Sequence, residues 1–184
     1  MKGSSPYRQP ILLFRNNRNR TFEDVSALSG LDKLTPESRR GVAFGDVNND
    51  GKVDVLLLNV GQPPTLLINR TQNQNHAVLF HLVGTKSNKA AIGARVTVTA
   101  GSVVQFSEVR GGGSYCSQND LRLHFGLGTE TSMTAEVLWP SGEKETYKDL
   151  AADFIYTIVE DKGVSAKTAF AGAPSVSKTA DSGR

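Results

Sequence analysis

A nine-residue stretch of the sequence carries oxygen-bearing side chains at odd-numbered positions. Asp46, Asn48, Asp50 and Asp54 occupy its first, third, fifth and ninth positions. Hard divalent cations such as Ca²⁺ take about six to eight oxygen ligands at about 2.3–2.6 Å, and this spacing wraps such ligands around one centre. The stretch therefore predicts a calcium site with three negatively charged side chains.

Two further residues of the stretch support this prediction. Gly51, at the sixth position, allows a sharp turn, and the backbone carbonyl of Lys52, at the seventh, is a candidate ligand. An EF-hand is excluded because its bidentate glutamate is replaced by Leu57 and because strands are predicted on both sides. The alternative is a metal-free hairpin turn, which also favours Asn, Asp and Gly. In either case we expect a structural role, since no general base accompanies the loop.

Catalytic chemistry is the second possibility. Ser114 and Asp120 could join a histidine such as His124 in a nucleophilic triad, whose members need not be neighbours in sequence. No nucleophile-elbow motif is present, however, and the glycine-rich loop Gly111–Tyr115 is not followed by the Gly-Lys-Ser/Thr of a phosphate-binding loop. We therefore predict no catalytic residue. A hydrolase or biosynthetic accessory enzyme with a site near this loop is the alternative function.

The distribution of charge decides whether nucleic acid is an expected partner. The chain has 184 residues, with 21 Lys and Arg against 18 Asp and Glu and a formal net charge of +3. The positive surplus lies in residues 1–40 and 161–184, whereas residues 41–160 carry more acidic than basic side chains. We therefore expect no nucleic-acid partner. The longest apolar runs, such as Val55–Leu58, are far too short for a membrane span.

The elements that must position these residues are predicted to be strands. Apolar runs at 42–44 and 53–60 flank the acidic stretch, and residues 10–16 resemble residues 64–70, an internal echo typical of propeller blades. After residue 75, short runs of alternating polarity are separated by glycine-containing turns, which favours a small antiparallel sandwich or barrel. The predicted fold class is all-β.

Three zones follow from this pattern. We expect a partial propeller repeat with the calcium loop at residues 1–75, a small β domain at 76–160 and a disordered tail at 161–184. A single blade buries its faces only against neighbours, so we expect the C-terminal portion of a larger repeat protein, with the remaining blades or another chain completing the open edges. The first residues lack the apolar stretch of a signal peptide, and we expect that signal upstream.

Two sets of motifs resemble known families. The stretch Arg40-Gly-Val-Ala-Phe-Gly-Asp-Val-Asn-Asn-Asp-Gly-Lys-Val-Asp54 resembles an FG-GAP/VCBS-type repeat, the integrin-like β-propeller blade with a calcium loop. Phe125-Gly-Leu-Gly and Trp139-Pro-Ser-Gly resemble the ASPIC/UnbV domain. The resemblance implies calcium ligands at the four oxygen-bearing positions named above, with Asn48 where Asp is usual. It also implies a non-enzymatic extracellular or periplasmic module that binds a protein or glycan partner.

Overall fold

The structure is a computed structural model in which residues 7–172 are described, and this part of the chain is all-β, as predicted. Its first strands are β1 (Phe14–Asn16), β2 (Phe22–Asp24), β3 (Arg39–Gly45), β4 (Asp54–Asn59) and β5 (Thr65–Leu67), with a short 3-10 helix, η1 (Leu31–Lys33), after β2. The later strands are β6 (His76–Val83), β7 (Arg95–Ala100), β8 (Val103–Glu108), β9 (Leu123–Gly128), β10 (Ser132–Leu138), β11 (Lys144–Ala151), β12 (Phe154–Val159) and β13 (Gly163–Ala169). Among these residues, no helix has the length and apolar character needed to cross a membrane.

The first five strands form two small antiparallel sheets. β1 pairs with β2, while β3, β4 and β5 form a three-stranded meander. β3 and β4 flank the acidic stretch, as predicted, and meet at its base. Leu57 of β4 is buried, whereas Leu56, Leu58 and Leu66 on the opposite face of the meander are between 44% and 49% exposed. One face of this sheet is therefore open to solvent.

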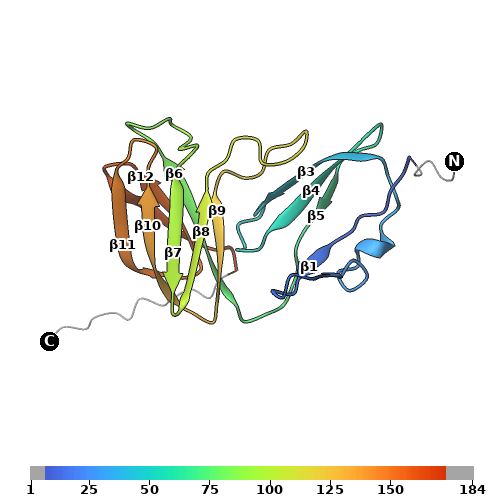
Figure 1. Ribbon diagram of the computed structural model, residues 1–184, viewed down its shortest axis with the longest axis horizontal. Helices are drawn as coiled ribbons and strands as arrows, with labels where there is room; N and C mark the ends of the chain where they lie inside the picture. Colours follow the sequence, from blue (N-terminus) through green and yellow to red (C-terminus); the bar gives the residue numbers. More distant parts are fainter. Residues whose placement is uncertain (1–6, 173–184) are drawn as a thin grey trace.

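The later strands form a two-sheet sandwich (Figure 1). One sheet has the order β11-β10-β7-β8 and the other has the order β13-β12-β6-β9. Side chains from both sheets share a single core, which includes Phe80, Val96, Phe125, Val137 and Tyr156. The alternating pattern of these strands places every second residue in that core. Of the two predicted architectures, a sandwich or a barrel, the described strands adopt the sandwich.

One strand pairing departs from the predicted antiparallel arrangement. β12 runs parallel to β6, with Phe154 opposite Val78 and Val159 opposite Val83. Parallel neighbours cannot be joined by a hairpin, and here residues 84–153 form the connection. The alternating pattern of a strand is the same in either direction, so the sequence of β12 could not distinguish the two orientations.

The prediction of a disordered tail from residue 161 is wrong for β13, which pairs antiparallel with β12 and widens the sheet. Nearly all β13 side chains are exposed, so the strand lacks the apolar alternation by which strands are predicted. Its order comes instead from the backbone ladder and from the Lys167 ammonium group, which lies 3.9 Å from the centre of the Phe154 ring. Residues 173–184 of the predicted tail lie outside the described residues.

The long connection between β8 and β9 reaches the N-terminal sheet (Figure 1). The Ser117 hydroxyl accepts the Val42 N–H at 3.1 Å and donates to the Val42 carbonyl at 2.7 Å. The Asp120 N–H donates to the Phe44 carbonyl at 2.9 Å. These bonds occupy backbone groups along the outer edge of β3, which would otherwise be free to pair with another strand. The β8–β9 connection therefore holds the meander against the sandwich.

Candidate metal-binding loop

The predicted calcium stretch forms the connection between β3 and β4, and its tight curvature depends on two residues with positive φ. Asn49 has φ of 59° and Gly51 has φ of 82°. Asn is among the side chains that tolerate this region, and Gly adopts it without steric cost. A Cβ on Gly51 would also lie 2.4 Å from the Phe170 ring. Two independent reasons therefore favour glycine at position 51: its positive φ and the close approach of the Phe170 ring.

The two carboxylates at the ends of the loop are buried and bind backbone amides. Asp46 is 2% exposed, and its two oxygens accept the N–H groups of Asp50 at 3.1 Å and Gly51 at 2.8 Å. Asp54 is 1% exposed, and its oxygens accept the N–H groups of Val47 at 2.9 Å and Asn69 at 2.8 Å. The loop is thus folded around its own acidic side chains.

The middle of the loop is held by a second set of short-range contacts. Asn48 Oδ1 accepts the Asp50 N–H at 3.2 Å, and its amide nitrogen donates to Asp50 Oδ2 at 3.1 Å. Asp50 Oδ1 accepts the Lys52 N–H at 3.0 Å. The Lys52 ammonium group lies 3.8 Å from Asp50 Oδ2, an ion pair that the sequence analysis did not predict. The structure therefore brings all four oxygen-bearing side chains into one loop.

The donor set of this loop suits a hard cation, although the carboxylates have not converged on one point. Within residues 7–172, no three His, Cys, Asp or Glu side chains gather closely enough to hold a metal ion. Asp46 and Asp54 are nevertheless buried and have no ion-pair partner in that range, so only the two N–H donors that each one accepts offset the cost of burial, and a cation would offset it further. A carboxylate oxygen that accepts one amide hydrogen still has a lone pair for a metal. A bound cation would also be coordinated by the Asn48 side-chain oxygen and the Lys52 carbonyl oxygen.

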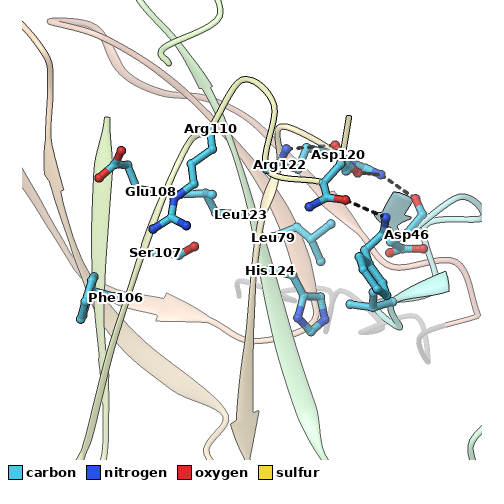
Figure 2. A pocket seen from close by; sticks show the side chains of 15 residues that line it. Asp46, Leu79, Phe106, Ser107, Glu108, Arg110, Asp120, Arg122, Leu123 and His124 are labelled. Carbon is cyan, nitrogen blue, oxygen red and sulfur yellow. Dashed lines mark hydrogen bonds and ion pairs between the residues drawn. The ribbon is translucent and has the colours of Figure 1, made fainter. Parts of the chain in front are cut away.

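Arg122, at the end of the β8–β9 connection, holds the outer side of the loop (Figure 2). Its Nη2 donates to the Asp46 carbonyl at 2.5 Å, and its Nη1 donates to Asn49 Oδ1 at 2.6 Å. Its Nε donates to Asp120 Oδ2 at 2.7 Å. Sequence reasoning missed Arg122, because these loop residues lie more than 70 positions away and no local motif connects them.

Three further groups from the sandwich contact the same loop. His124 Nε2 lies 2.8 Å from the Gly51 carbonyl, so this nitrogen carries the hydrogen, because a carbonyl oxygen only accepts. The Ala171 N–H donates to the Asn49 carbonyl at 2.6 Å. Phe170 is only 7% exposed and lies against Gly51. The later part of the chain therefore contacts the loop at Asp46, Asn49 and Gly51.

A cavity of about 410 Å³ adjoins this contact, and Figure 2 shows the side chains around it. Glu108 and Arg110 come from the β8 side, whereas Asp120 and His124 come from the β9 side. The outward-facing Leu79 of β6 also lines the cavity and is only 1% exposed. The junction between the two halves thus combines a few apolar contacts with many polar ones.

Comparison with known proteins identifies both halves of the chain. The family described as FG-GAP-like repeat matches residues 4–57, and the family described as ASPIC and UnbV matches residues 84–165. The first part of the chain is therefore similar to an FG-GAP-like repeat and the second part to an ASPIC and UnbV domain, and neither match alone covers half of the chain. Both resemblances predicted from the sequence motifs are confirmed.

Among curated proteins, the chain is similar to cartilage acidic protein 1. It is 29% identical to the Homo sapiens protein over 141 residues, which cover 74% of this chain and 21% of that protein. It is 33% identical to the Xenopus tropicalis protein over 91 residues, which cover 50% of this chain and 14% of that protein. The chain therefore spans only about a fifth or less of the length of these relatives.

The candidate loop lies within the FG-GAP-like repeat, and its outer contacts come from the other family. Asp46 and Asp54 fall inside residues 4–57, whereas Arg122 and His124 fall inside residues 84–165. Phe170 and Ala171 lie just beyond the second match. The contacts around the loop are therefore contacts between the FG-GAP-like repeat and the ASPIC and UnbV domain.

The enzymatic candidates are not brought together. The Ser114 hydroxyl donates to the Val42 carbonyl at 2.6 Å, and Asp120 binds Arg122. His124 is engaged by the Gly51 carbonyl, so the three members of the suggested triad have three different partners. In the described chain no hydrogen bond joins a serine hydroxyl to a histidine ring. The geometry therefore gives no support to a nucleophilic serine near the Gly111–Tyr115 loop.

Proposed function

We propose that this chain is a calcium-stabilised, non-enzymatic interaction module that acts outside the cell. The supporting observation is the pair of buried carboxylates, Asp46 and Asp54, which have no ion-pair partner in the described residues and lie in a loop of an FG-GAP-like repeat. Repeats of this type commonly bind calcium. The similarity to cartilage acidic protein 1 supports the extracellular part of the proposal.

The proposed calcium ligands are the ones expected from the spacing. Asp46, Asn48, Asp50 and Asp54 would contribute side-chain oxygens, and Lys52 would contribute its carbonyl. The bound ion would offset the repulsion among three carboxylates within nine residues and the burial of two of them, Asp46 and Asp54. Asp50 would exchange its contacts with the Asn48 amide nitrogen and the Lys52 ammonium group for the metal, because both groups now face its Oδ2.

Thermal melting of the 184-residue chain over a series of Ca²⁺ concentrations tests this proposal. A ligand that binds only the folded state at about 100 times its Kd adds about 2.7 kcal/mol of stability, so we expect the Tm to rise by several degrees. The Asp50→Ala variant should lose the Ca²⁺-induced rise in Tm. Asp32→Ala, which removes an exposed acid of η1 in the same repeat, should keep it. A wild-type Tm that does not respond to Ca²⁺ would remove the metal from the proposal.

The partner surface is proposed on the open face of the β3–β4–β5 meander. Leu56, Leu58 and Leu66 form an exposed apolar row there, with Leu56 directly opposite Leu66. Apolar rows of this kind on a folded protein mark places where another protein surface packs. A protein partner or remaining propeller blades, from the same or another chain, would cover this row. We keep the predicted organisation, a repeat at residues 1–75 followed by a β domain, as part of the proposal, with β13 now added to the second unit.

A further inference from the structure

Arg122 stands between the proposed calcium loop and the ASPIC and UnbV domain. We propose that Arg122 is a positioning residue for the loop and that calcium binding and the docking of the two halves of the chain are coupled through it. This inference rests on the proposed function, since it concerns the same loop. Arg122 lies outside the FG-GAP-like repeat, so a residue of the second half of the chain would control the metal site.

Hydrogen bonds hold the short backbone of the loop from its inner and from its outer side. The Asp46 side chain points inward to the amides of the loop, while its carbonyl oxygen is fixed from outside by Arg122 at 2.5 Å. Asn49, one residue beyond the proposed ligand Asn48, is fixed by Arg122 at its side chain and by Ala171 at its carbonyl. Any movement of the outer contacts therefore moves the residues that carry the proposed ligands.

Asp120 makes Arg122 a rigid support. The Asp120 carboxylate accepts hydrogen bonds from Arg122 Nε at 2.7 Å and from the Arg122 backbone N–H at 2.9 Å. The Asp120 N–H in turn donates to the Phe44 carbonyl of β3, immediately before the loop. The guanidinium group is thus oriented by a carboxylate that is itself attached to the strand leading into the loop. Its charge is also neutralised locally by that carboxylate.

The positive charge of Arg122 and its hydrogen bonds to the loop predict opposite changes in Ca²⁺ affinity when Arg122 is removed. A guanidinium group near a divalent cation repels it, so loss of charge alone would strengthen Ca²⁺ binding. Loss of a group that orients a ligand-bearing segment weakens metal binding, typically about 10- to 100-fold. The sign of the change in affinity therefore separates the two explanations.

The coupling must also be reciprocal. If Arg122 and its neighbours favour the metal-binding form of the loop, then the metal must favour the docked arrangement by the same factor. The Ala171 N–H, which donates to the Asn49 carbonyl across the junction, reports this arrangement directly. We expect its hydrogen exchange to slow when Ca²⁺ is added to the wild-type chain.

The test is a calorimetric titration of the full chain with Ca²⁺, in wild type and in three variants whose folding is verified by circular dichroism. Arg122→Ala should bind Ca²⁺ about 10- to 100-fold more weakly. Arg122→Lys, which keeps the charge but loses the planar fork of donors, should also bind more weakly. Arg110→Ala removes a positive charge from the lining of the same cavity, where its side chain has no hydrogen-bond or ion-pair partner in the described residues, and should bind within about twofold of wild type.

The outcomes distinguish this inference from the proposal on which it rests. No binding to wild type would refute the calcium proposal itself. Binding to wild type together with equal or tighter binding to Arg122→Ala would refute the positioning role. If Arg122→Ala does not fold, Asn49→Gly decides instead, because glycine accepts the same positive φ and only the Arg122 acceptor is lost. Unchanged affinity in Asn49→Gly would then contradict the coupling.

Discussion

Glu160 is a fully buried carboxylate at the end of β12, and its hydrogen bonds tie two loops to the sandwich. Its Oε2 accepts the backbone N–H groups of Thr85, Lys86 and Ser87 at 2.7–2.8 Å, and its Oε1 accepts the hydroxyls of Ser87 and Ser141 at 2.8 and 2.6 Å. Burial alone would raise the pKa of Glu160. The hydrogen bonds, with that of Ser141 the strongest, outweigh burial and lower the pKa to about 2.

Replacing Glu160 by alanine leaves three consecutive amides without their acceptor. A buried donor without a partner costs about 1–3 kcal/mol, and water entering the vacated space would recover part of that cost. We therefore expect Glu160→Ala to lower the free energy of unfolding at pH 7 by about 3–5 kcal/mol. Glu160→Gln can turn its carbonyl oxygen toward the amides and its NH₂ toward the serine hydroxyls. Its free energy of unfolding should fall by only about 1–2 kcal/mol, because the hydrogen bonds remain and lose only the part of their strength that comes from the carboxylate charge.

The same carboxylate predicts a dependence of stability on pH. The pKa in the folded chain, about 2, is below the ordinary value of 4.5, so the folded state holds the ionised form more strongly than the unfolded state does. The stabilisation is therefore complete above pH 4.5 and is lost as the pH falls from 4.5 toward 2. Glu160→Gln has no such group, so the stability gap between wild type and Glu160→Gln should narrow over this range.

Urea unfolding followed by tryptophan fluorescence measures both effects. Trp139 is the single tryptophan of the chain, is 1% exposed and lies in the sandwich core, so its emission reports this domain. If Glu160→Ala lowers the free energy of unfolding by less than about 1 kcal/mol, the Glu160 carboxylate does not have the stabilising role assigned to it. A gap between wild type and Glu160→Gln that stays constant between pH 6 and pH 3 would refute the assigned pKa.

Two further predictions concern the FG-GAP-like repeat. Gly51→Ala should lower the free energy of unfolding in urea by about 1–3 kcal/mol, because φ is 82° and the new Cβ would lie 2.4 Å from the Phe170 ring. Phe170→Ala removes that ring, so the loss in the double variant should be smaller than the sum of the two single losses. Strictly additive losses would exclude the steric part of this explanation. Leu58→Glu, on the open face of the meander, should change the free energy of unfolding by less than about 0.5 kcal/mol and reduce binding of an apolar dye and self-association in sedimentation. Unchanged dye binding and sedimentation would exclude Leu58 from the interaction surface.

The position of the candidate loop could be predicted because its signals are local. Asp46 to Asp54 carry their spacing within nine residues, and the apolar runs on either side predict β3 and β4 directly. Arg122 could not be predicted in the same way. Its role depends on the β8–β9 connection lying against β3, and an arginine beside an aspartate in a polar segment has the same local pattern as any solvated turn. The metal itself stays a proposal.

The end of the second domain could not be predicted from side-chain pattern either. β13 is an exposed edge strand, and its order comes from pairing with β12. The ASPIC and UnbV match ends at residue 165, within this strand. A protein cut at that boundary would lose part of β13 together with Phe170 and Ala171, which contact the candidate loop. Experiments on the loop therefore need a chain that extends at least to residue 171.

The parallel pairing of β6 with β12 sets an order of events for synthesis and folding. β6 lies between β9 and β12 in its sheet, and both partners follow it in the chain, β9 from residue 123 and β12 from residue 154. During translation the apolar segment around Phe80 therefore emerges long before either neighbour can cover its edges. Such distant pairings fold slowly and leave unpaired edges that invite aggregation. A ribosome that stalls between β9 and β12 would release a chain whose central strand still has one open edge.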